Sequence, residues 1–386
     1  MSDQPIRELD GKTPLMAAHT PNLDRMVRDG VGGWSRNTPP GFHPGSDVAN
    51  LGVLGYDVTQ GYTGRSPLEA AAMGVTLSPT DVAFRCNLVT LSDDYRIMGD
   101  FSAGHISTPE ASEIIKTLDQ ELGSELFRFH PGVSYRHLLV WNGGGQELRC
   151  APPHDISDRP IEGHLPTGPD SDPIRELMIR SRDILADHPV NRKREAEGQL
   201  PANSIWLWGH GKKPGLTPFT ERFGKQGGMI SAVDLMRGIA VHIGFENIHV
   251  PGATGWIDTD YGGKAQACID GLNRNDLIFI HVESPDEAGH AGRLDYKLQA
   301  IEDFDAKVVG PVLAHLVERG PFRAISLPDH PTPIATKTHN PDPVPFALYG
   351  TGISPDSNQT YDEGLIETAS LTFDPGSRMM AYLLDL

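Results

Sequence analysis

A chain of 386 residues with 38% hydrophobic and 22% charged side chains has the composition of a globular protein and is long enough for two domains. Its net charge of −18 argues against nucleic acid or an anionic membrane surface as a partner, because both favour a basic patch. No apolar run approaches the roughly 18–20 residues that cross a bilayer, and three cysteines are too few for a disulfide framework. We therefore expect a cytoplasmic protein with reduced thiols.

The amino-terminal region predicts a helix over about residues 14–29, followed by a loop rich in glycine and proline and a second helix that starts near Ser46. A serine at that position lies beside the free N–H groups and the positive dipole end of the helix, where a phosphate can bind. On residue type alone, an N-cap serine is the simpler interpretation.

The middle of the chain alternates short strands with helices. Residues 82–90 and 135–141 predict strands, and residues 108–122 and 172–187 predict helices. This mixture indicates an α+β unit, which we expect to end in the polar segment 187–198.

The last part of the chain predicts a second fold type. Strands are expected at 204–209, 246–250, 277–282, 323–328 and 345–350, with helices at 229–243 and 294–318. Strands that alternate with helices in this way indicate a mostly parallel sheet.

Two of these predicted strands end in metal-ligand side chains. Asp286 and His290 follow the strand at 277–282, and Asp329 and His330 follow the strand at 323–328, with His339 nine residues further on. A single Asp-x-x-x-His is more simply explained as a helix start with an incidental histidine. Two strand ends that supply carboxylates and imidazoles together suit Zn²⁺ or Mn²⁺ and are enough for two ions.

The order of several motifs resembles one known family. The motifs are Gly45-Ser-Asp47, Leu51-Gly-Val-Leu-Gly-Tyr-Asp57, Tyr62-Thr-Gly-Arg65, Asp81-Val-Ala-Phe-Arg-Cys-Asn87, Pro152-Pro-His-Asp-Ile156, Pro251-Gly-Ala-Thr-Gly255, Asp286-Glu-Ala-Gly-His290 and Asp329-His-Pro-Thr-Pro333. Together they resemble the archaeal-type cofactor-independent phosphoglycerate mutases of the alkaline phosphatase superfamily. The resemblance implies an α/β fold with a mostly parallel sheet flanked by helices. Residues 1–65 and 202–386 would form the metal-binding domain, and residues 66–201 an inserted smaller α+β domain.

The resemblance also implies interconversion of 3-phosphoglycerate and 2-phosphoglycerate through a phosphoserine, without 2,3-bisphosphoglycerate. It assigns Ser46 as the nucleophile and a metal ligand together with Asp329 and His330. Asp286, His290 and His339 would hold the other of two divalent ions, Mn²⁺ or Zn²⁺, with Mg²⁺ or Co²⁺ as alternatives.

The expected substrate is a small phosphorylated molecule, whose ligands would be Arg65, Arg85, His105, Arg136, Asp155 and Lys264. A guanidinium suits a carboxylate or phosphate, although for each arginine a structural ion pair is an equal alternative. His105 is the candidate for proton transfer between the glycerate hydroxyls. The oligomeric state is not predicted.

The chain departs from the family pattern at its start. Members of the family begin with an apolar strand that ends in Asp-Gly, whose aspartate completes the serine-side metal site, and Met1 stands where that strand should have finished. We expect either a start codon placed late or a non-catalytic relative. A phosphatase or phosphotransferase for another small phosphate ester is a further alternative.

Overall fold

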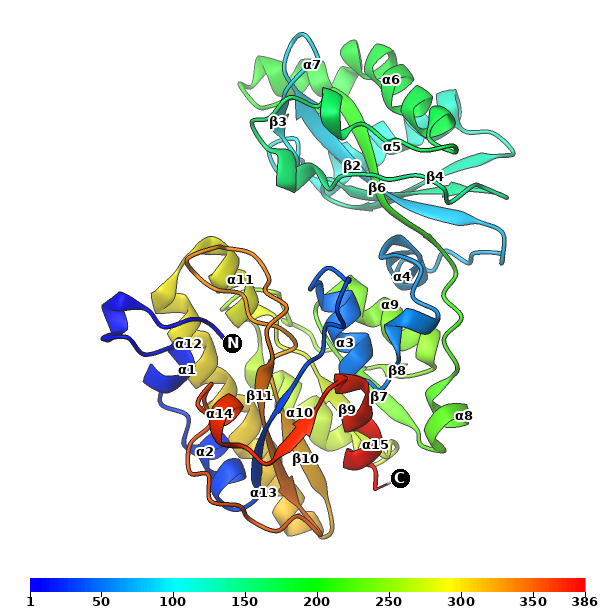
Figure 1. Cartoon of the computed structure of the whole chain (residues 1–386). Helices are drawn as coiled ribbons and strands as arrows, with labels where there is room; N and C mark the ends of the chain where they lie inside the picture. The colour runs from blue at the N-terminus through cyan, green and yellow to red at the C-terminus, as the bar shows by residue number, and fades with distance from the viewer. Residues whose placement is uncertain (386) are drawn as a thin grey trace. The chain divides into compact units, whose positions relative to one another are not determined.

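The computed structural model describes residues 1–385 and divides into two compact units, Met1–Tyr62 with Gly215–Leu386, and Thr63–Pro214 (Figure 1). The chain therefore leaves the larger unit once and returns to it, as an inserted domain requires. The return lies later than the predicted boundary at residue 202, because Ser204–Lys212 belongs to the smaller unit.

The smaller unit is an antiparallel sheet covered by helices. Its strands are β2 (Val82–Leu91), β3 (Met98–Asp100), β4 (Phe127–Val133), β5 (Arg136–Trp141) and β6 (Ser204–Lys212), and its helices are α4 (Ser66–Ala72), α5 (Thr108–Leu122), α6 (Asp172–Ala186) and α7 (Pro189–Ala196). β2 pairs antiparallel with β5 and β6, and all of its residues are buried. The sequence pattern of residues 204–209 predicts a strand that restarts the other domain, and this prediction is wrong. A strand's own sequence does not show which neighbour it pairs with, and here β2 supplies the partner.

The larger unit contains two sheets rather than the one mostly parallel sheet predicted. β7 (Gly227–Ile230), β8 (Glu246–Asn247) and β9 (Leu277–Ile280) form a parallel sheet in the order β8-β7-β9. β1 (Val31–Ser35), β10 (Arg323–Ser326), β11 (Val344–Gly350) and β12 (Leu371–Phe373) form a mixed sheet in the order β10-β11-β1-β12. β11 runs antiparallel to β10 and β1, since the connection after β10 contains no crossover helix.

The helices of the larger unit follow the prediction more closely. They are α1 (Pro14–Ala17), α2 (Pro21–Arg28), α3 (Ser46–Val53), α8 (Phe219–Phe223), α9 (Asp234–Ile243), α10 (Tyr261–Gly271), α11 (Ser284–Ala291), α12 (Leu294–Phe304), α13 (Gly310–Arg319), α14 (Leu365–Thr368) and α15 (Met379–Leu383). A π-helical turn, Asp305–Val309, joins α12 to α13, so the predicted helix 294–318 forms. The helix predicted from residue 229 begins at Asp234, because Gly227–Ile230 is β7.

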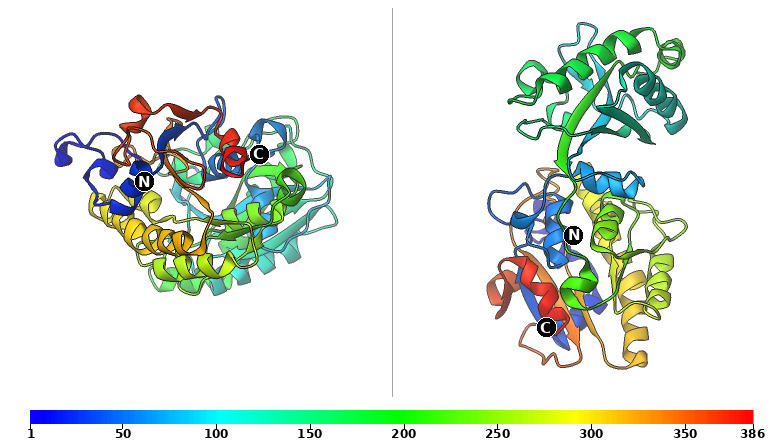
Figure 2. Two further views of the ribbon diagram at one scale, coloured as in Figure 1. Left: turned by 90° about the horizontal axis from the view of Figure 1, so that it is seen from below. Right: turned by 90° about the vertical axis from the view of Figure 1, so that its right-hand side faces the viewer.

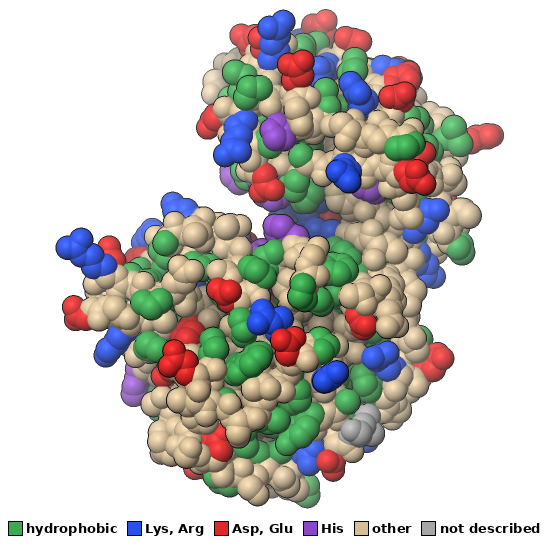
Figure 3. All heavy atoms as spheres, viewed as in Figure 1, with side chains coloured by type: hydrophobic (Ala, Val, Ile, Leu, Met, Phe, Trp, Pro, Cys, Tyr) green, Lys and Arg blue, Asp and Glu red, His purple; other side chains and the backbone are tan. Residues whose placement is uncertain are grey.

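The surface carries acidic and basic side chains interspersed on the face shown in Figure 3. Within residues 1–385, no helix combines the length and the apolar character that a membrane span requires.

Candidate metal centre

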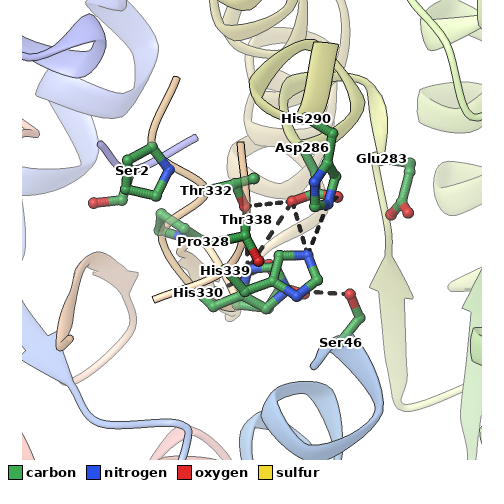
Figure 4. A network of polar contacts seen from close by, with 12 residues as sticks. Ser2, Ser46, Glu283, Asp286, His290, Pro328, His330, Thr332, Thr338 and His339 are labelled. Carbon is green, nitrogen blue, oxygen red and sulfur yellow. Dashed lines mark hydrogen bonds and ion pairs between the residues drawn. The ribbon is translucent and has the colours of Figure 1, made fainter. Parts of the chain in front are cut away.

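Ser46 is the first residue of α3, and Gly45 precedes it as the N-cap without a side-chain capping bond. The N-cap interpretation of Ser46 is therefore wrong. Its hydroxyl oxygen lies 3.1 Å from Nε2 of His330 instead (Figure 4). The sequence signal for a serine at a helix start was correct, and the hydroxyl faces away from its own helix toward a histidine that is buried in the same unit.

Asp286 and His290 lie on one face of α11, directly after β9, as their spacing of four predicts. His290 Nε2 is 3.2 Å from Asp286 Oδ2. The other ring nitrogen, Nδ1, is 2.9 Å from the main-chain oxygen of Lys337. A carbonyl oxygen only accepts hydrogen bonds, so Nδ1 carries a proton, and Nε2 donates to the Asp286 carboxylate. Burial lowers the pKa of His290, but the hydrogen bond to Asp286 and its charge, with the Lys337 carbonyl, raise it to about 9. Binding of a metal ion at Nε2 would therefore release a proton.

Asp329, His330 and His339 come from the segment that follows β10. His330 is 2% exposed, and its Nε2 is 3.3 Å from Asp329 Oδ2. His339 places its Nε2 2.9 Å from Nε2 of His290 and 3.6 Å from Asp286 Oδ1. Figure 4 shows these rings and the Asp286 carboxylate pointing toward one another. The two strand ends predicted to supply ligands are therefore brought together.

The residues present fit a divalent cation. One ligand atom each from Asp286, His330 and His339 lies within 4.8 Å of the other two. Burial raises the pKa of Asp286, but hydrogen bonds from His290 and His339 lower it well below its usual value, so the carboxylate is charged. A carboxylate with converging imidazoles suits Zn²⁺ or Mn²⁺. The sequence predicts that His330 binds the ion beside Ser46 and that Asp286 and His339 bind the other ion. The structure instead places these three residues in one group.

Three residues that support the centre were missed from the sequence. Asn50 donates from Nδ2 to Asp329 Oδ2 and to the main-chain oxygen of Ser46, both at 2.8 Å. Thr332 donates its hydroxyl to Asp286. The buried His281 has its Nε2 3.3 Å from Glu283, whose carboxylate lies on the same side of the cluster as Ser46 in Figure 4. The spacing of Asn50, four residues after Ser46 on a predicted helix, was the available signal.

Lys264 is buried in α10, and its Nζ is 3.0 Å from the main-chain oxygen of His281. Burial lowers the pKa of its amine to about 8, although the nearby Glu283 raises it. Lys264 is thus held just behind the strand end that leads to Asp286.

In the smaller unit, three of the predicted substrate ligands surround one carboxylate. Arg65 Nε is 2.8 Å from Glu69 Oε1, and Arg85 donates to the same oxygen. Burial raises the pKa of Glu69, whereas Arg85, Arg65 and Arg136 together lower it. The structural ion pair is therefore present for Arg85 and Arg65. Arg136 also lies over the Tyr135 ring, 5.4 Å from its centroid.

The remaining two predicted ligands lie near one aromatic group. His105 is exposed in a left-handed turn with φ 52°, and its ring centroid is 6.0 Å from that of Tyr135. Asp155 is 3.7 Å from His154 Nε2, and the His154 ring packs edge-on against Phe101 and Trp208. His105 also contacts Phe101, so both imidazoles pack against the same ring.

The larger unit thus defines an α/β protein with a candidate divalent-metal centre at its strand ends. Comparison with known proteins is specific. A family model for 2,3-bisphosphoglycerate-independent phosphoglycerate mutase matches residues 28–191. A protein of Geobacter sulfurreducens named as a probable enzyme of this kind is 52% identical, with 100% of this chain and 97% of that protein covered. The enzyme of Methanosarcina barkeri is 50% identical over the same shares.

Two solved structures resemble this chain over its whole length. A protein from Pyrococcus horikoshii superimposes with a TM-score of 0.82 at 28% identity, covering 100% of this chain and 95% of its own. A cofactor-independent phosphoglycerate mutase from Thermoplasma acidophilum gives 0.66 at 26% identity, covering 100% and 96%. The chain belongs to the 2,3-bisphosphoglycerate-independent phosphoglycerate mutases.

Proposed function

We propose that this protein interconverts 3-phosphoglycerate and 2-phosphoglycerate through a phosphoserine at Ser46. The observation that carries the proposal is the position of the Ser46 hydroxyl, at the start of α3 and 3.1 Å from His330, beside converging carboxylates and imidazoles. A phosphate on that oxygen would face the free N–H groups of the first helical turn, which favour an anion.

The donor set supports two divalent ions, Mn²⁺ or Zn²⁺, held by Ser46, Asp286, His290, Asp329, His330 and His339. When bound, such ions lower the pKa of a serine hydroxyl and offset the charge of a phosphoryl group during in-line transfer. Asn50 would then fix the position of the nucleophile relative to a metal ligand, because its amide group contacts both the Ser46 backbone and the Asp329 carboxylate.

A mutase must retain the glycerate while its phosphate is on the serine. We assign this task to Arg65, Arg85, His105, Arg136 and Asp155 of the smaller unit. Three guanidinium groups around the single carboxylate of Glu69 leave an excess of positive charge, which supports binding of an anionic glycerate. Lys264 is the proposed phosphate contact in the larger unit. We also propose a cytoplasmic location, because the proposed substrate is a metabolite of glycolysis.

The experiment is a discontinuous assay that follows both 2-phosphoglycerate and inorganic phosphate from 3-phosphoglycerate, with added Mn²⁺. A mutase converts the phosphate ester and releases little phosphate. Stoichiometric release of phosphate would instead assign a phosphatase, and the absence of both products would assign a non-catalytic relative. Intact-mass measurement of the acid-quenched protein should show one added phosphoryl group, absent from Ser46→Ala.

A further inference from the structure

Three consecutive residues of the smaller unit, Ala103, Gly104 and His105, have left-handed backbones, with φ of 49°, 63° and 52°. Within residues 1–385, no other three consecutive residues share this conformation. Residues other than glycine disfavour it, because Cβ comes too close to the following carbonyl oxygen. Such strain persists only where the surrounding structure fixes it, and it is concentrated at functional sites. His105 stands at the end of this turn.

Asp100 and Ser102 fix the N–H groups of the turn. Asp100 Oδ1 accepts from the N–H groups of Ser102 and Gly104, at 2.7 and 3.0 Å, and from the Ser102 hydroxyl at 2.6 Å. The Ser102 oxygen accepts in turn from the N–H of His105 at 3.0 Å. Burial raises the pKa of Asp100, but these hydrogen bonds and the nearby His105 lower it below its usual value, so the carboxylate is charged. The backbone of His105 is therefore held although its side chain is exposed.

Arg194 fixes the carbonyl side of the turn. This residue of α7 is 3% exposed, and its Nη2 donates to the main-chain oxygen of Ala103 at 2.8 Å. The same guanidinium donates from Nε to the Leu200 carbonyl and from Nη1 to Glu110 Oε2, both at 2.9 Å. Because Glu110 lies in the first turn of α5, one buried cation joins two helices to the turn. Figure 2 shows the helices α5, α6 and α7 gathered on one face of the sheet of this unit.

The turn presents the His105 ring to two aromatic side chains. Its centroid lies 6.0 Å from that of Tyr135 and 6.5 Å from that of Phe101, and both contacts are edge-on. Tyr135 belongs to the same assembly, because the hydroxyl of its neighbour Ser134 donates to the Ile106 carbonyl at 2.8 Å. An exposed side chain without such contacts changes rotamer within nanoseconds. Here the backbone and both rings restrict the direction of the imidazole.

We propose that Arg194 is a positioning residue, which holds the strained turn so that His105 presents its imidazole to the substrate in one direction. The inference rests on the proposed function for the task of His105, which is proton transfer between the glycerate hydroxyls. Arg194 acts only through His105, since its Nε, Nη1 and Nη2 each donate to a protein oxygen. Proton transfer depends steeply on geometry, and a misplacement of about 1 Å can lower a rate about 10²-fold.

The first measurement follows the ring by NMR and needs no activity. The Hε1 proton of His105, assigned by its absence from the spectrum of His105→Asn, should carry a ring-current shift from the two aromatic neighbours. Arg194→Met should move this signal to the position of an unstructured histidine and speed hydrogen exchange at the His105 amide. Arg192→Met is the matched control on the same helix, because its contact with Asp187 is exposed, and it should change neither.

Ser102→Ala is a milder variant, which keeps the proposal testable if Arg194→Met does not fold. It removes the acceptor of the His105 N–H without removing a charge. We expect the His105 signal to move in the same direction as in Arg194→Met.

The second measurement is a double-mutant cycle on kcat with 3-phosphoglycerate, at a temperature where every variant is fully folded. If Arg194 acts through His105, Arg194→Met should lower kcat roughly 10–100-fold in the parent but less than about threefold in His105→Asn. An equal factor in both backgrounds would assign Arg194 to stability alone and overturn the inference, as would an unmoved His105 signal in Arg194→Met. An inactive parent whose His105 signal still depends on Arg194 would contradict the proposed function and support the positioning role.

Discussion

The Ser46 hydroxyl oxygen lies 3.1 Å from Nε2 of His330, although 284 positions separate the two residues in the chain. One residue starts a helix and the other follows a strand, and both are in the larger unit. The chemistry proposed for this protein depends on that contact.

We expect Ser46→Ala to lower mutase activity at least about 10³-fold, because no serine oxygen would then carry the phosphoryl group between its two positions on glycerate. The unfolding midpoint should change little, since the hydroxyl makes no capping bond to α3. Coupled assay and urea unfolding provide the measurements. Ser181→Ala, which removes a buried hydroxyl that donates to the Met178 carbonyl and accepts from the Ile205 N–H, is the matched control and should keep its activity. Residual phosphoserine turnover in Ser46→Ala would remove this residue from the mechanism.

Metal content should separate the two proposed ion sites. His290→Ala and His339→Ala are each expected to lose about one equivalent of Mn²⁺ after dialysis, and Asp329→Ala the other, because each ion would lose a ligand of a small set. Elemental analysis at matched protein concentration gives the stoichiometry. His188→Ala, a helix-capping histidine of the smaller unit, is the control and should retain all bound metal. Equal metal content in the three ligand variants would contradict the assignment.

The Arg85–Glu69 pair allows its structural role to be separated from substrate binding. Arg85→Met removes one of the two guanidinium partners of the Glu69 carboxylate, which is 14% exposed. Arg65 remains paired with the same oxygen, so we expect a loss of about 1–3 kcal/mol of unfolding free energy. The double variant Glu69→Leu/Arg85→Met should recover most of that loss, since no charge is then left buried.

If Arg85 also binds glycerate, the double variant should regain stability without regaining activity. Arg182→Met, which removes a guanidinium stacked on the Tyr95 ring, is the control and should cost only about 1 kcal/mol. Full activity in the stable double variant would leave Arg85 with a purely structural role.

A buried histidine predicts how stability depends on pH. His137 is 3% exposed and accepts a hydrogen bond at Nδ1 from the Gly132 N–H. Burial, with the positive charge of Arg85, lowers its pKa from 6.5 to about 3. Between these two values the unfolded chain binds a proton that the folded chain does not. The unfolding free energy should therefore fall as the pH falls below 6.5, by about 1.4 kcal/mol per pH unit from this group.

His137→Asn keeps an acceptor near the Nδ1 position but does not titrate. Urea unfolding at pH 7, 6 and 5 should show a shallower pH dependence in the variant than in the parent. Other titrating groups are common to both proteins and cancel in the comparison. Parallel curves would show that His137 is not buried in its neutral form.

Local features of the chain predicted much of the site. The spacing of Asp286 and His290 placed both side chains on one helical face, and the short apolar runs before Asp286 and Asp329 correctly marked strand ends. The long helix after residue 294 and the strand Val82–Leu91 formed where their apolar patterns predicted them. Each of these depends on backbone periodicity within a few turns, which a sequence displays directly.

Local sequence patterns could not predict which distant strands pair with each other. β6 has the apolar pattern of a buried strand in either domain, and only its hydrogen bonds to β2 place it in the smaller unit. The direction of β11 and the identity of β7 as a strand were missed for the same reason. Arg85 carries a charge that suits a ligand or an ion pair, and its contact with Glu69 appears only in the folded chain.

The sequence by itself determined which side chains stand at the ends of strands and at the start of α3, because local periodicity and turn residues act over a few positions. Only the tertiary structure decided which of those ends meet. It brought His330 to Ser46 and His339 to His290. Such contacts are selected by the burial of apolar surface and the pairing of backbone groups across the whole unit, which no short stretch of sequence contains.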